Sequence, residues 1–281
     1  MSRDRLDDFT VEEFTADGKT HPVYVKGSGP AVIVISEIPG ITPLVADFAR
    51  RVVDAGCTVF LPSLFGIDGL NPRPSVKPGD LADSARMAGN LVRKVCVSRE
   101  FTILATGRSS PVVTWLRALA REAHERCGGP GVGAIGMCLT GGFALAMAVD
   151  DTMIAPVLSQ PSLPLRPLGN ARNIDISDAD LARVKTRCAG GLQVMGMRFE
   201  GDPMVPPERF AFLREQLGDA FIGIELPDSA ANPDAVLPVP HSVVTEHLID
   251  EPGQPTREAL DRVIAFFTAK LGVPATPPTT R

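Results

Sequence analysis

The chain has no surplus of positive charge: its 281 residues include 28 Lys and Arg against 33 Asp and Glu, a formal net charge of −5. Binding to nucleic acid or to an anionic membrane surface requires clustered cationic side chains in excess. The composition therefore argues against both classes of partner. A small-molecule substrate is the remaining expectation.

Cysteine is scarce as well, and its spacing suits neither a disulfide framework nor a zinc site. The chain has five Cys, an odd number, widely spaced and with no CxxC pair. The first residues, MSRDRLDD, lack the apolar run of a signal peptide. We therefore expect reduced thiols in a cytoplasmic protein.

Charged residues are missing from residues 127–149, a stretch long enough to cross a bilayer. Seven of its positions are Gly and one is Pro. These residues divide the stretch into a short strand, a turn and a helix. We expect no membrane span here.

Strands and helices alternate along most of the chain. Residues 31–36, AVIVIS, are typical of a strand buried on both faces, and residues 43–55 carry apolar side chains at helical spacing. This alternation predicts an α/β fold with a doubly wound, mostly parallel sheet and helices on both faces. The expected strands are 11–15, 21–26, 31–36, 58–61, 132–136, 153–158, 191–198 and 220–226, and the expected helices are 43–55, 80–96, 109–125, 141–149, 177–187, 206–217 and 257–271.

Two regions interrupt the alternation. A Pro/Gly-rich insertion with a helix covers about residues 62–107 and could flank a site. Residues 227–256 have no regular pattern, and loops of that length are usually functional or disordered. The length allows two domains, but such sheets often occupy about 250 residues as one. We expect a single domain over residues 1–281 with a mobile tail at 274–281.

The most specific local pattern is GMCLTGG at residues 136–142, between an expected strand and an expected helix. A nucleophile on such a sharp turn needs small residues two positions before and after it, and Gly136 and Thr140 meet that need. The start of a helix favours the thiolate of Cys138, the form that attacks carbonyl carbon. The same pattern also fits a buried structural thiol.

Two of the four histidines follow Cys138 in the chain, as the base must if the order is that of an α/β-hydrolase triad. His241 lies in the long late loop, from which it could reach the carboxyl ends of the strands. We expect His247 on a surface turn. His241 is therefore the predicted base.

A candidate acid follows the strand expected at residues 191–198. Asp202 leaves the carboxyl end of that strand in a Gly-Asp-Pro turn, where its carboxylate could orient an imidazole. Asp before Pro is also common as a turn or helix-capping residue. Glu200 and Asp228 are the alternative acids.

With these residues in view, the sequence resembles the dienelactone hydrolase family of α/β-hydrolases. The matching segments are SEIPG at residues 36–40, GMCLTGG at residues 136–142, and GDP at residues 201–203 with HS at residues 241–242. The resemblance extends from about residue 11 to about residue 271.

The resemblance implies a triad of Cys138, Asp202 and His241 that needs no metal and no organic cofactor. It also implies that Glu37 hydrogen-bonds the resting thiol and can take its proton when substrate arrives. The alternative for Glu37 is a solvated loop carboxylate, but its place after an apolar strand, at the edge where ligands of such sheets bind, argues against that.

By the same resemblance, the backbone N–H groups of Leu139 and Ile38 form the oxyanion hole.

Several positions depart from the family pattern. In the turn that carries the nucleophile, called the elbow below, the family has Gly where this chain has Thr140. In the loop that carries the glutamate, the family has a bulky aromatic residue where this chain has Pro39. Archetypal members bind the substrate carboxylate through arginines, one of them at the position of Thr245, and a single Tyr leaves few aromatics for the pocket. Arginines in or beside the insertion could replace the missing one or lie on the surface: Arg86, Arg93 and Arg108.

The sequence thus predicts a hydrolase of carboxylic esters or lactones with a thioester acyl-enzyme on Cys138. Two alternatives stay open. The same scaffold could catalyse acyl transfer or cleave a carbon–halogen bond, or it could bind a small ligand without catalysis.

Overall fold

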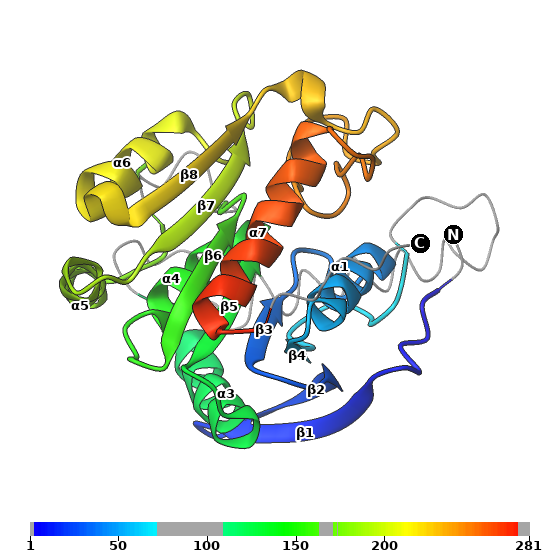
Figure 1. Cartoon of the computed structure of the whole chain (residues 1–281). Coiled ribbons are helices and arrows are strands. Elements are labelled where there is room, and N and C mark those ends of the chain that lie inside the picture. Colours follow the sequence, from blue (N-terminus) through cyan, green and yellow to red (C-terminus); the bar gives the residue numbers. More distant parts are fainter. Residues whose placement is uncertain (1–2, 72–108, 163–170, 173, 275–281) are drawn as a thin grey trace.

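The computed structural model describes residues 3–71, 109–162, 171–172 and 174–274 (Figure 1). One eight-stranded sheet runs through these residues in the order β1-β2-β4-β3-β5-β6-β7-β8. Its strands are β1 (Thr10–Ala16), β2 (Lys19–Gly27), β3 (Ala31–Ile35), β4 (Thr58–Pro62), β5 (Val132–Met137), β6 (Met153–Ser159), β7 (Val194–Phe199) and β8 (Phe221–Leu226).

The sheet is mostly parallel, as the sequence predicts. The pairs β1–β2 and β2–β4 are antiparallel, and every other neighbouring pair is parallel. The central strands are apolar and buried along their whole length, because both faces of the sheet are covered. The α/β-hydrolase architecture is confirmed.

Helices cover both faces of the sheet. On one face, Phe48 and Val263 pack into a common core, and on the other Trp115 and Phe143 pack into a second core. The first face is covered by α1 (Pro43–Asp54) and α7 (Pro255–Leu271), and the second by α3 (Val112–Cys127), α4 (Gly141–Met147), α5 (Asp178–Ala189) and α6 (Pro207–Leu217) (Figure 1).

Local signals set the ends of several helices. At the start of α1, the Thr42 hydroxyl accepts the Val45 N–H at 3.3 Å, and Pro43 occupies the first helical position. At the end of α7, Gly272 takes the left-handed conformation. Every predicted element that falls on described residues lies within three residues of its observed bounds.

The loops after β3, β5, β6 and β7 all leave the same edge of the sheet, because these strands are parallel. Residues 227–254 pack beyond this edge with a single short helical turn, Asp228–Ala230, which confirms the predicted lack of regular structure. This edge is where the candidate site forms.

Some predictions fall outside the described residues. They are the helix at 80–96, the rest of the insertion from residue 72 on, and nearly all of the tail, residues 275–281. In the part of the chain that the structure describes, no helix is both long and apolar enough to cross a membrane.

Candidate active site

The turn between β5 and α4 holds Cys138 in a strained conformation. Its backbone φ is +55°, a region that residues with a side chain rarely adopt. A Cβ on Gly136 would lie 2.0 Å from the Thr140 carbonyl oxygen, so the turn closes only with glycine there. Strand and helix can therefore approach closely enough to present Cys138 at the tip of the turn.

Thr140 strengthens this turn although the family pattern has Gly there. Its side chain is fully buried, and its hydroxyl accepts the Met137 N–H at 2.9 Å. The same hydroxyl lies 3.1 Å from the carbonyl oxygen of Ile35, to which it can donate. The hydroxyl thus connects the elbow to the end of β3.

Cys138 is half-buried and lines a cavity of about 440 Å³. The cavity walls include Glu37, Ile38, Cys138, Leu139, Ser162 and His241. Ile38 and Leu139, the two residues expected to supply the oxyanion hole, thus lie on the same cavity as the sulfur. A thiol buried among aliphatic side chains, the structural alternative for Cys138, does not describe this surrounding.

Ser162 is a polar neighbour of the nucleophile. Its Oγ lies 3.1 Å from the Cys138 Sγ, and its backbone N–H donates to the Cys138 carbonyl oxygen at 2.9 Å. The chain at Pro161 can come this close because Gly141 has no side chain. A Cβ on Gly141 would lie only 2.4 Å from the Pro161 Cα. Sequence analysis missed Ser162, since no motif marks it.

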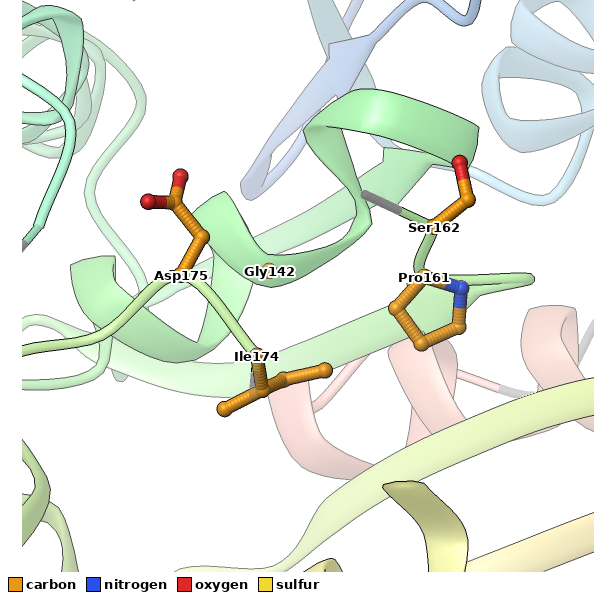
Figure 2. A pocket seen from close by; sticks show the side chains of 5 residues that line it. All are labelled: Gly142, Pro161, Ser162, Ile174 and Asp175. Carbon is orange, nitrogen blue, oxygen red and sulfur yellow. The ribbon is translucent and has the colours of Figure 1, made fainter. Parts of the chain in front are cut away.

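Figure 2 shows the surroundings of Ser162 at the start of α4. The segment of Pro161 and Ser162 lies on one side of Gly142, and the segment of Ile174 and Asp175 lies on the other. A Cβ on Gly142 would lie 2.2 Å from the Ile174 carbonyl oxygen. Small residues at the start of α4 thus let two loops pack against the helix that carries the elbow.

His241 and Asp202 form a buried pair beside the cavity. Asp202 Oδ2 lies 2.6 Å from His241 Nδ1, and the two residues are 2% and 1% exposed. The other oxygen, Oδ1, accepts the Met204 N–H at 2.9 Å. The carboxylate therefore fixes both the ring orientation of His241 and the turn that follows β7.

The protonation of His241 depends on both of its neighbours. Burial alone would lower its pKa, but the interactions with the side chains of Asp202 and Cys138 outweigh burial and raise the pKa of His241 to about 10. Nε2 is buried and makes no hydrogen bond to a described residue. Nε2 is thus the ring nitrogen available to the thiol.

Glu37 is buried, but its carboxylate does not bind the thiol. Its Oε2 accepts from Gln160 Nε2 at 3.0 Å and from Ser242 Oγ at 2.6 Å, and its Oε1 accepts from Thr245 Oγ1. The expected hydrogen bond to Cys138 is therefore wrong for this structure, because the carboxylate binds these three donors instead. The solvated alternative does not hold either, since Glu37 is 6% exposed.

Gln160 is a second residue that sequence analysis missed. It follows β6 with a backbone φ of +33°, is fully buried, and donates to Glu37 while its own Oε1 accepts from Ser159 Oγ. A polar pair directly after an apolar strand, at the edge where ligands bind, was the available signal.

His247 is not on the surface, so that expectation is wrong. It is 2% exposed and stacks edge-on against Phe199. Its Nδ1 accepts the backbone N–H groups of His241 at 3.3 Å and Ser242 at 3.1 Å, and its Nε2 donates to the Leu237 carbonyl oxygen at 3.1 Å. Burial lowers the pKa of His247, so the ring stays neutral and holds the loop.

Neither of the alternative acids, Glu200 and Asp228, is hydrogen-bonded to the His241 ring. Asp228 accepts the Gly201 N–H at 2.8 Å, and Glu200 is exposed. The three arginines considered for a substrate carboxylate, Arg86, Arg93 and Arg108, lie outside the described residues. Among the described residues, no three His, Cys, Asp or Glu side chains gather as a metal site would require.

Comparisons with known proteins identify the family and the fold. A model of the dienelactone hydrolase family matches residues 20–177, more than half of the chain. No curated protein sequence matches the chain significantly.

Solved structures resemble the chain over almost its whole length. A dienelactone hydrolase from Anabaena variabilis is 16% identical, with a TM-score of 0.57 over 94% of this chain and 98% of that one. A cold-adapted esterase from an Arctic intertidal metagenomic library is 14% identical, with a TM-score of 0.52 over 96% and 97%. A dienelactone hydrolase-like promiscuous phosphotriesterase from metagenomic libraries is 16% identical, with a TM-score of 0.55 over 94% and 98%. At these identities the likeness concerns the fold.

Proposed function

This chain belongs to the dienelactone hydrolase family, and from that premise we propose that it hydrolyses carboxylic esters or lactones through Cys138. The observation that carries the proposal is the arrangement around one cavity. Cys138 sits on a strained elbow, and His241, fixed by Asp202, has a ring nitrogen left for the thiol. This is the arrangement that nucleophilic catalysis by cysteine requires.

The proposed reaction starts from a thiolate on Cys138 and an imidazolium on His241, the thiol proton having passed to Nε2. In the first half, the thiolate attacks the carbonyl carbon of the ester. The carbonyl π electrons move to oxygen, and the backbone N–H groups of Leu139 and Ile38 stabilise the oxyanion. When the oxyanion collapses, the carbon–oxygen bond to the alcohol breaks, and the leaving oxygen takes the proton of the His241 imidazolium. The product is a thioester on Cys138 and a free alcohol.

The second half requires His241 as a base. In the thioester the sulfur carries no charge, so one of the two groups that raise the pKa of His241 is lost and its pKa falls. The neutral ring then takes a proton from water, the resulting hydroxide attacks the thioester, and the thiolate leaves. The acid is released and the starting pair of thiolate and imidazolium is restored.

Glu37 has a different role in this proposal from the one that the resemblance implied. In this structure its carboxylate binds Gln160, Ser242 and Thr245, which together donate three hydrogen bonds to it, and it does not bind Cys138. Two of those donors lie on the loop of His241. We assign Glu37 to holding that loop, as a positioning residue, and leave the proton of Cys138 to His241.

The first test is Cys138→Ala, assayed with p-nitrophenyl acetate. Loss of the nucleophile should lower kcat by about 10³-fold or more while the circular dichroism spectrum and melting temperature stay close to the unaltered protein. Cys188→Ala is the matched control, because Cys188 is also a half-buried free thiol but lies on α5. Turnover that survives Cys138→Ala would contradict the proposal.

A further inference from the structure

Large hydrophobic side chains are strongly exposed at five positions in the described part of the chain, and four of the five belong to two segments that line the cavity. Between 38% and 44% of each of the four is accessible, and exposed apolar side chains at the mouth of a cavity are typical of a ligand-binding site. The four are Met204, Val236, Leu237 and Val239, and we call them the apolar rim.

The rim is held in place by the residues that hold the base. The Met204 N–H donates to Asp202 Oδ1, and the Leu237 carbonyl oxygen accepts from His247 Nε2, whose other nitrogen binds the His241 N–H. Met204 and Leu237 also line the cavity directly. The exposed side chains are therefore part of the site and do not belong to an unrelated surface.

The position of the rim indicates which part of a substrate it meets. His241 must give its proton to the leaving oxygen, so the alcohol portion of an ester lies on the His241 side of the carbonyl carbon. One rim segment is hydrogen-bonded to Asp202 and the other is connected to the His241 backbone through His247. An alcohol portion that extends beyond the cavity would therefore lie against the rim.

We propose that the substrates are esters with an apolar alcohol portion, such as an unbranched alkyl group, which packs on the apolar rim. This inference rests on the proposed esterase function and adds the substrate class. Transfer of one methylene from water to a fully apolar surface favours binding about fourfold, and a half-exposed rim should give about half of that free energy, roughly twofold.

The test compares ethyl acetate, hexyl acetate and ethyl hexanoate by titrating the acid released. Hexyl acetate and ethyl hexanoate are isomers, so they differ only in which side of the ester is long. We expect kcat/KM for hexyl acetate to exceed that for ethyl acetate by roughly tenfold, and ethyl hexanoate to gain much less. Equal gains for the two isomers, or no gain for hexyl acetate, would overturn the inference.

Substitutions in the apolar rim test whether the rim is the part of the protein that binds the longer alcohol portion. Leu237→Ser and Met204→Ser should each reduce the ratio of kcat/KM for hexyl acetate over ethyl acetate by about threefold. Val11→Ser is the control, because Val11 is the fifth exposed hydrophobic side chain and lies on edge strand β1, at the far side of the sheet. Its ratio should stay that of the unaltered protein.

Other outcomes are informative too. If Leu237→Ser turned a dimer into a monomer in sedimentation experiments and left the ratio unchanged, the rim would be an interface between copies, and the inference would be wrong. If none of the three esters nor p-nitrophenyl acetate were hydrolysed, the proposed function itself would fail.

Discussion

Asp202 and Glu37 are two buried carboxylates that hold the same loop, residues 241–247, through partners of opposite character. Asp202 binds the imidazole of His241, which gains and loses a proton during the proposed reaction. Glu37 binds an amide and two hydroxyls, none of which titrates near neutral pH. Asp202 therefore acts on the protonation of the proposed base, whereas Glu37 acts only on the position of the loop.

The largest effect should come from Asp202→Asn. An amide carries no charge to stabilise the imidazolium and can donate to Nδ1, which would fix the wrong tautomer of His241. We expect kcat for p-nitrophenyl acetate to fall by roughly 10³-fold or more, as for other buried triad acids. The pKa of His241, followed by NMR, should fall as well, because Asp202 is one of the groups that raise it.

Asp228→Asn is the matched control, since Asp228 accepts a backbone N–H in the turn next to Asp202 but does not bind the imidazole. It should change kcat little. If the two substitutions had equal effects, Asp202 would serve only the turn, and the difference between the two carboxylates would vanish.

A smaller effect should come from Thr245, a hydroxyl donor to Glu37. Thr245→Val keeps the shape of the side chain but leaves Glu37 one donor short, which should lower the free energy of unfolding by roughly 1–2 kcal/mol. Because the loop that carries His241 loses one hydrogen bond to Glu37, kcat should fall several-fold. Urea unfolding and steady-state kinetics measure the two effects.

Thr245→Ser keeps the hydroxyl and should restore most of both quantities. The kinetics of Thr245→Val also distinguish between Glu37 as a positioning residue and Glu37 as a proton acceptor. If Glu37 were the proton acceptor for Cys138, Thr245→Val would free it for that task, and turnover would stay the same or rise.

The fold was predictable because its signals are local, and so were five of the ten residues that line the cavity. Apolar β-branched runs mark the central strands, and parallel strands bring their carboxyl ends to one edge, which places Glu37, Cys138 and Asp202 near one another. The strained elbow follows from the small residues around Cys138. These inferences require only short segments and one topological rule.

The donors around Glu37 could not be predicted in the same way. Gln160 and Thr245 lie more than 80 residues apart in the chain, and neither stands in a recognisable motif. His247 follows the polar residues Thr245 and Glu246 in a segment without regular structure, yet Phe199 from β7 covers it. Burial of a loop without regular structure depends on tertiary packing, which spacing along the chain does not reveal.

The two imidazoles of the loop, His241 and His247, also differ in how they titrate. This difference predicts the smallest effect, a change in the pH dependence of stability. The pKa of His241 is raised, whereas burial lowers the pKa of His247 below its usual value of 6.5. Below pH 6.5 the unfolded chain protonates His247 while the folded protein resists, so the unfolded state binds more protons. Stability should therefore fall as the pH drops, by at most about 1.4 kcal/mol per pH unit from this residue.

His247→Asn isolates this contribution. The Asn oxygen can accept the two N–H groups that Nδ1 accepts, and it does not titrate. Urea unfolding at pH 5, 6 and 7 should show a smaller loss of stability on acidification for the variant than for the unaltered protein, since the carboxylates titrate equally in both. Parallel pH dependences would mean that His247 takes up its proton as readily in the folded protein as in the unfolded chain. Its Nδ1 could then not accept from the His241 backbone, and the loop would have to be held in another way.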